Sequence, residues 1–69
     1  MNHSLKWTDV REIAEALYEA HPDKNPLLIN FVDLMGLIIA LPAFADDPKH
    51  CNERVLEAVQ GLWIEEAEE

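Results

Sequence analysis

The chain has 69 residues, and its 14 Asp and Glu against 5 Lys and Arg give a formal net charge of -9 at pH 7. A chain this short buries only about 60% of the surface that it exposes when unfolded, which disfavours a deep catalytic cavity. The negative charge repels phosphate backbones and anionic lipids, so nucleic acid and membranes are excluded as expected partners, whereas basic proteins and cations are favoured.

The first four residues carry no pattern, so we expect a disordered tail at 1–4 and a single helical domain over 5–69. No basic and apolar leader opens the chain, and its single cysteine, Cys51, cannot close an intrachain disulfide. A cytoplasmic location is therefore the default expectation. The most apolar stretch, residues 34–41, is far shorter than the about 20 residues that cross a bilayer.

Residues 10–20 are predicted to form the first helix. Apolar side chains recur there at the three- and four-residue spacing of a helix face that lies on a core. A second stripe, which we call the acidic row, has five carboxylates at the same spacing: Asp9, Glu12, Glu15, Glu19 and Asp23. Asp9 and Glu12 also have the spacing of a capping box, in which each side chain accepts a hydrogen bond from a first-turn amide.

The turn residues of 22–26 end this helix, and their closing Asn-Pro pair predicts one further helical turn. Residues 30–32 are weak helix formers, so we expect a short extended segment there, with at most one or two short β pairings near residues 30–31. Asp33 is then expected to cap a second helix over 34–41.

The second predicted helix is apolar around its whole circumference, which is unusual for a small domain. If its other large apolar side chains face the core, Met35 and Ile39 point outward. Either neighbouring segments bury both sides, or Met35 and Ile39 form an apolar contact patch. The second alternative leaves open a homo-oligomer through helix 34–41.

The third predicted helix begins at Asp47-Pro48 or at Asn52 and frays at the closing EEAEE. Trp7 and Trp63 stand at the edges of apolar patterns and are expected to anchor the core. The chain has no internal repeat and no alternating strand pattern. The sequence therefore predicts an all-α fold, a small three-helix domain with at most a minimal β pairing.

Motifs for catalysis or tight cofactor binding are missing from the sequence. There is no zinc-ligand spacing, calcium loop or glycine-rich phosphate loop, and spacing reveals no base beside Cys51, so no enzymatic activity is expected. Carboxylates one helical turn apart, such as Glu15 with Glu19 and Glu19 with Asp23, could share iron. Solvated helical carboxylates bind such a cation only weakly, and the alternative is a charged face without a ligand.

Five ordered motifs of the chain resemble the IscX family of iron–sulfur cluster assembly, and together they cover nearly the whole domain. They are LKWTD (5–9), REI-x-EALY-x-A-x-PD (11–23), P-x3-NFVDL (26–34), F-x-DDP (44–48) and NE-x-VLEAV-x-x-LW-x-EEAE (52–68). The resemblance implies a fold of modified winged-helix type. It also implies a small acidic protein that binds the cysteine desulfurase IscS through an acidic surface and binds iron weakly.

The acidic surface of the family carries over to six matching positions of this chain: Asp9, Glu12, Glu15, Glu19, Asp23 and Asp33. The chain departs from the family at 35–45, where it reads MGLIIALPAFA and the family tends to be polar and acidic. The second acidic cluster of the family is thereby reduced to two residues, and the weak iron candidates become Glu15, Glu19, Asp23, Asp46 and Asp47.

Three hypotheses of function follow. The first is a non-enzymatic adaptor or regulator of iron–sulfur cluster assembly, whose acidic helix face docks on a basic surface of the desulfurase. The alternative is an iron-binding protein that donates or buffers iron for cluster assembly. A third hypothesis is an acidic inhibitor that mimics nucleic acid on a basic enzyme. Activation and inhibition of sulfur transfer both stay open.

Overall fold

The computed structural model describes residues 4–68, so residues 1–3 of the expected tail and Glu69 lie outside the described residues. The described part contains three α-helices and two short 3₁₀ turns, which confirms the all-α, three-helix class. In chain order these are α1 (Val10–Ala20), η1 (Pro26–Leu28), α2 (Phe31–Ile39), η2 (Pro48–His50) and α3 (Glu53–Glu68). None of the described helices is long and apolar enough to cross a membrane.

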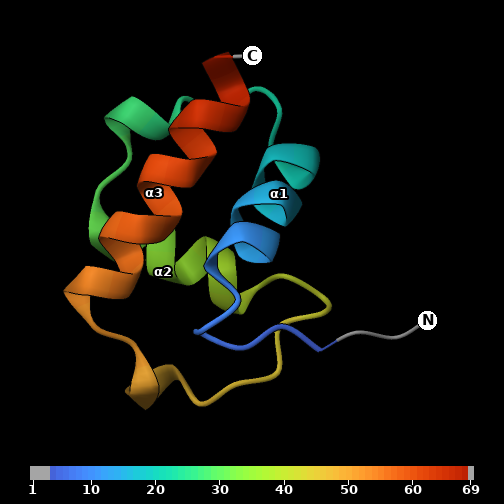
Figure 1. Ribbon diagram of the computed structural model, residues 1–69, viewed down its shortest axis with the longest axis vertical. Coiled ribbons are helices and arrows are strands. Elements are labelled where there is room, and N and C mark those ends of the chain that lie inside the picture. The colour runs from blue at the N-terminus through green and yellow to red at the C-terminus, as the bar shows by residue number, and fades with distance from the viewer. Residues whose placement is uncertain (1–3, 69) are drawn as a thin grey trace.

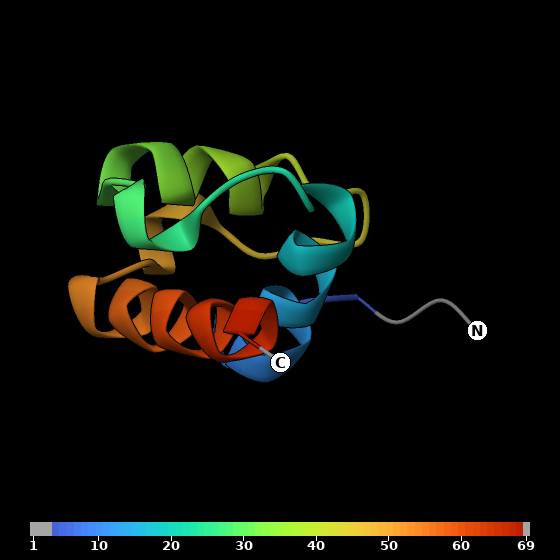
Figure 2. The ribbon, with the colours of Figure 1, turned by 90° about the horizontal axis from the view of Figure 1, so that it is seen from above.

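The three helices form two layers. Helices α1 and α3 pack chiefly on each other and run in the same direction, so that both end at the top of Figure 1. Helix α2 and η1 form the second layer, which faces α3 in the view from above, and α1 runs between the two layers at one end of the molecule (Figure 2). The principal extents of the molecule are 28 × 28 × 16 Å.

The core consists of apolar side chains from all three helices and from the N-terminal segment. Trp63 is fully buried and Trp7 is 3% exposed, which confirms both as core anchors. Complete burial of a large apolar side chain contributes about 1.5–3 kcal/mol relative to exposure. The other buried apolar residues are Leu5, Ile13, Ala14, Leu17, Leu34, Ile38, Leu41, Leu56 and Val59.

The capping box expected at the start of α1 is wrong. Asp9 is the residue before the helix, but its side chain makes no capping hydrogen bond. Its carboxylate accepts instead from the backbone N–H of Lys6 at 3.0 Å. The side chain therefore turns back toward the N-terminal segment, and it stabilises the turn that leads into the helix.

The expected start of the second helix is also wrong. Helix α2 begins at Phe31, because the side-chain oxygen of Asn30 caps it by accepting from the backbone N–H of Asp33 at 2.8 Å. Asn30 in turn donates through Nδ2 to the Asp33 carboxylate at 3.2 Å. This reciprocal cap makes 31–33 helical despite weak intrinsic propensity, and α2 ends at Ile39 rather than at residue 41.

The two predicted starts of the third helix each begin a different element, η2 and α3. Asp47 precedes η2 and accepts from the N–H of Lys49, whereas Asn52 precedes α3 and accepts from the N–H of Val55 at 2.9 Å. Helix α3 continues to Glu68, so the closing glutamates are helical over the described residues and the expected fraying is wrong there.

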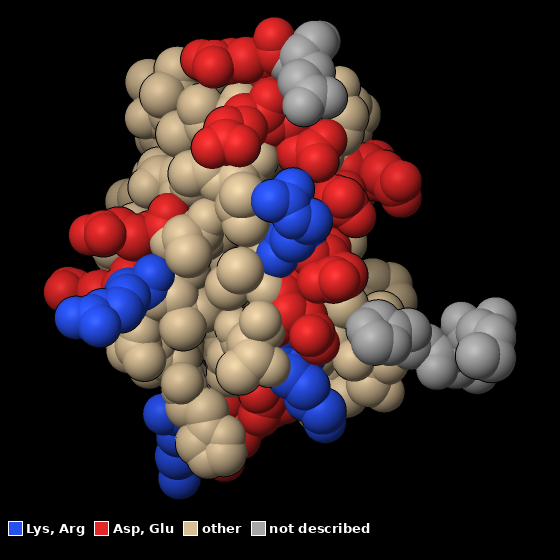
Figure 3. Space-filling view, viewed as in Figure 1, with Lys and Arg blue, Asp and Glu red and all other residues tan. Residues whose placement is uncertain are grey.

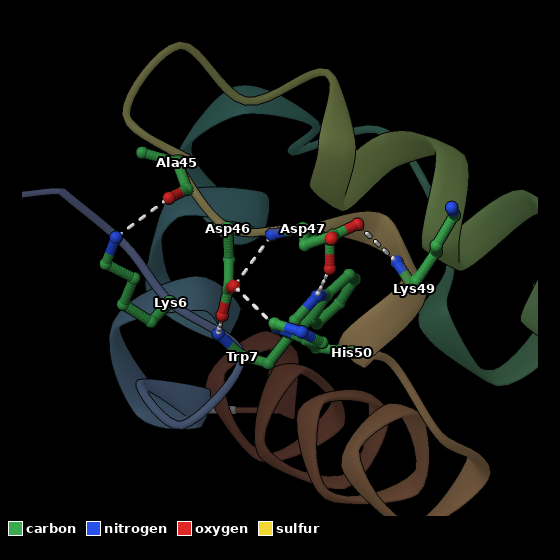
Figure 4. Close-up of polar contacts among 7 residues, drawn as sticks. All are labelled: Lys6, Trp7, Ala45, Asp46, Asp47, Lys49 and His50. Atoms are coloured by element: carbon green, nitrogen blue, oxygen red, sulfur yellow. Dashed lines mark hydrogen bonds and ion pairs between the residues drawn. The ribbon is translucent and has the colours of Figure 1, made fainter.

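The N-terminal segment is held by the loop between α2 and η2, which we call the N-terminal clasp (residues 5–7 against 43–47). A parallel β-bridge joins Leu5 to Phe44, and the backbone N–H of Leu5 donates to the carbonyl of Ala43 while its carbonyl accepts from the N–H of Ala45. Trp7 donates from its backbone to Asp46 and from its indole nitrogen to the Asp47 carbonyl at 2.7 Å (Figure 4). The minimal β pairing is thus confirmed, but it lies here rather than near residues 30–31.

Candidate protein-docking surface

The acidic row lies on the exposed side of α1 and in the turn that follows it. Glu12, Glu15, Glu19 and Asp23 are exposed, whereas Asp9 is half-buried by its contact with the N-terminal segment. Figure 3 shows acidic side chains along the side of the molecule that α1 forms. Among residues 4–68, the only ion pair joins His50 to Asp46, so no Lys or Arg of the described chain forms an ion pair with the row.

The C-terminal turn of α3 adds more negative charge beside the row. Helices α1 and α3 both end in the upper part of Figure 1, and neither has a basic residue in its last turn. Figure 3 shows acidic side chains gathered over these two ends. Carboxylates at helix C-termini face the negative end of the helix dipole, so this arrangement costs stability. The sequence could not reveal it, because it depends on how α1 packs on α3 in the fold.

Asp33, the sixth acidic residue predicted for docking, is separated from most of the row. It is exposed on the first turn of α2, where it lines an open groove together with Asp23. The six predicted residues therefore lie in two places, namely along α1 and at this groove, where Asp23 and Asp33 form a pair. Asp23 belongs to both, because the turn that contains it connects α1 to η1 (Figure 2).

Apolar side chains are most exposed next to that groove. Leu28 and Val32 are 83% and 81% exposed, and Leu27 is 63% exposed. The residues predicted as the apolar contact patch differ from these, because Met35 is half-buried against the core and Ile39 is 38% exposed. The run of three apolar residues after Pro26 was the available signal, since one short turn cannot bury all of them.

Asp46 and Asp47 belong to the clasp rather than to α1. The Asp46 carboxylate accepts from the N–H groups of Trp7 at 3.0 Å and Asp47 at 2.7 Å, and it lies 3.3 Å from Nδ1 of His50 (Figure 4). These contacts, with the Trp7 bond largest, lower the pKa of Asp46 against a smaller effect of desolvation. Both carboxylates therefore have structural partners.

The predicted iron candidates are distributed over two places, namely α1 with its following turn and the clasp. Within residues 4–68, no three His, Cys, Asp or Glu side chains gather in a way that could hold a metal ion. Glu15 and Glu19 remain one helical turn apart on the exposed side of α1. Cys51 is half-buried, and this burial raises the pKa of its thiol, so little thiolate is present at neutral pH.

The structure thus defines a small, strongly acidic helical domain whose distinctive chemistry lies on its surface. Comparison with known proteins agrees with an accessory role for such a domain. The family described as iron–sulphur cluster assembly matches residues 5–68. An uncharacterized protein of Pseudomonas aeruginosa, PA3808, is 56% identical over 63 residues, which are 91% of this chain and 96% of that protein. The chain belongs to the iron–sulphur cluster assembly family.

Proposed function

We propose that the protein is a non-enzymatic adaptor or regulator of IscX type, which docks its acidic row on a basic surface of the cysteine desulfurase IscS. Membership of the iron–sulphur cluster assembly family supports a role in that process. The observation that carries the proposal is that four carboxylates of the row are exposed and that no Lys or Arg of the described chain pairs with them.

The energetics of such a contact follow from the exposure of the row. Each exposed ion pair contributes only about 0.2–1 kcal/mol, so single contacts give little affinity. The row as a whole accelerates the encounter with a positively charged surface, and this attraction is screened within about 10 Å at 0.1 M salt. We expect a dissociation constant of about 1 µM that rises steeply with salt.

The test is a binding titration with purified desulfurase across a series of salt concentrations. The variant Glu12→Lys with Glu19→Lys reverses two charges of the row, both on exposed positions of α1. It should fold like the parent, as far-ultraviolet circular dichroism will show, and should bind about tenfold or more weakly at low salt. The salt dependence of its residual binding should be shallower than that of the parent.

The matched control is Glu53→Lys with Glu57→Lys, at the other end of α3. It makes the same change in net charge on exposed positions, and like Glu12, Glu53 is an acidic residue of the first helical turn. This control should bind more tightly than the α1 variant at every salt concentration. Equal losses in both variants would show that net charge alone matters and that the row is no docking surface.

Iron binding is the second proposal, in which the protein delivers or buffers iron as cargo for the assembly process. It is favoured only by the spacing of Glu15 and Glu19, which keeps two exposed carboxylates one turn apart on α1. Calorimetry with ferrous iron under anaerobic conditions tests it. Saturation at a defined stoichiometry that is lost in Glu15→Gln with Glu19→Gln supports iron binding, and a featureless weak titration contradicts it.

A further inference from the structure

The groove beside η1 combines apolar side chains with carboxylates. Leu28 and Val32 line it from η1 and from the first turn of α2, and each exposes more than four-fifths of its surface. Asp23 and Asp33 belong to the same lining, against one cation, Lys24. Large apolar side chains at this exposure are unfavourable in water unless something covers them, and a rim of carboxylates limits what can do so.

The exposed leucines stand on a fixed element rather than on a loose loop. Pro26 is buried, and Asn25 caps η1 by accepting from the N–H of Leu27 at 3.0 Å. Gln60 of α3 donates through Nε2 to the carbonyl of Pro26 at 2.8 Å and to that of Ile29 at 3.3 Å. The Asn25 cap and the Gln60 hydrogen bonds therefore fix the backbone of η1, and Leu28 points outward from this fixed backbone.

Gly36 leaves the α2 side of the groove open. It lies within α2 and lines the groove, and a Cβ added to it would meet nothing within 4 Å. Its φ is not positive, so the backbone does not require glycine there. A glycine inside a helix costs about 0.5–1 kcal/mol relative to alanine, and what it provides here is space for an incoming group.

Charge decides between the two kinds of occupant that would cover apolar side chains. A second copy of this chain brings a further charge of -9 to a groove that already has two carboxylates against one lysine. Such like-charge juxtaposition opposes self-association, whereas lysine and arginine side chains complement Asp23 and Asp33. The groove therefore fits a basic segment with an aliphatic side chain between its cations.

We propose that the groove receives an aliphatic side chain from a Lys- or Arg-rich segment of the same basic partner that the acidic row attracts. This inference rests on the proposed function and adds the residues that hold the complex together. The row governs how fast the two proteins meet, and Leu28 with Val32 govern how slowly they part, because buried apolar anchors act mainly on dissociation.

The proposal is tested by the kinetics of binding to immobilised desulfurase. The variant Leu28→Ala with Val32→Ala should raise the dissociation rate constant about tenfold and leave the salt dependence of association unchanged. Leu27→Ala is the matched control, because Leu27 is also exposed on η1 but does not line the groove. It should bind within about twofold of the parent, as residues outside the anchor do.

A second pair of variants fills space instead of removing it. Gly36→Gln places a larger side chain at the groove, and Gly61→Gln makes the same change in α3, where an added Cβ also meets nothing within 4 Å. Both replace a helical glycine by a better helix former, so both should be at least as stable as the parent. Gly36→Gln should dissociate faster from the desulfurase, and Gly61→Gln should match the parent.

The outcomes separate this inference from the proposed function. If the parent binds and both groove variants dissociate like it, the groove is not the anchor, while docking through the row stands. If the parent does not bind, both proposals are overturned. If sedimentation shows a dimer of the parent that the Leu28→Ala with Val32→Ala variant loses, a second copy covers the groove and the inference is wrong.

Discussion

At the scale of single residues, Asp46 has the most demanding role. Its carboxylate accepts two backbone N–H groups and contacts the imidazole of His50, and its side chain is only 19% exposed. The ionised form of this side chain therefore joins the segment before α1 to the loop that follows α2.

Stability should depend on pH through Asp46. Its pKa is lowered in the folded protein from the ordinary value of 3.8, so folding favours the ionised form. The resulting stabilisation is complete above about pH 4 and is lost as the pH falls through the folded-state pKa. Thermal unfolding, followed by tryptophan fluorescence between about pH 2.5 and pH 6, will measure this loss, because carboxylates titrate within about that range.

The variant Asp46→Asn identifies the group responsible. It should be less stable than the parent at pH 6 and should lose less stability on acidification, because the amide does not ionise. Asp33→Asn serves as a comparison at an exposed carboxylate with one side-chain contact. An acid dependence in Asp46→Asn that equals the parent's would assign the effect to other carboxylates.

At the scale of elements, asparagine caps decide where structure begins. Asn25, Asn30 and Asn52 each accept a backbone N–H at the start of η1, α2 and α3. Apolar periodicity correctly predicted the bounds of α1 and that one face of this helix lies on the core, because burial of a stripe needs no detailed geometry. It could not locate the start of α2, since a cap of about 1 kcal/mol outweighs the weak propensity of Phe31 and Val32.

Removing the cap of α2 should therefore destabilise the whole domain. Asn30→Ala should lower the free energy of unfolding by about 1 kcal/mol, which corresponds to about 4–8 °C in Tm for a domain of this size. Asn30→Ser retains an oxygen acceptor and should remain close to the parent. Urea denaturation measures both, and equal stability of Asn30→Ala and the parent would contradict the capping role.

Replacing the glycines of α2 and α3 should raise the stability of the domain, whereas removing the cap should lower it. Gly36→Ala and Gly61→Ala should each raise the free energy of unfolding by about 0.5–1 kcal/mol, because both positions are helical and an added Cβ meets no other atom. The same urea titrations measure the gain. A loss of stability in either variant would show that the helix surface there is more crowded than the structure indicates.

At the scale of the whole molecule, negative charge gathers over the upper part of the molecule, where α1 and α3 both end (Figure 3). The acidic row could be predicted from the sequence, because its spacing is a property of one helix. The joining of the row to the end of α3, and of Asp23 to Asp33 at the groove, depends on packing between segments. Such features follow only from the tertiary fold, which spacing along the chain does not specify.

This concentration of charge should reduce stability in a way that salt relieves. At low ionic strength Glu65→Gln with Glu68→Gln should raise the free energy of unfolding by about 0.3–1 kcal/mol, because two charges leave the negative end of the α3 dipole. The gain should shrink at high salt. Glu53→Gln, in the first turn of α3, should lower stability instead, and urea denaturation at two salt concentrations compares them.

The packing of α1 on α3 also sets a condition on biosynthesis. A lone helix of eleven residues is marginal in water, and the side chains that cover the inner face of α1 come mainly from the far end of the chain. The N-terminal clasp likewise needs residues about forty positions downstream of those that it holds. The docking surface is therefore created only when α3 has left the ribosome, so that a fragment ending before it presents no ordered binding site to any partner.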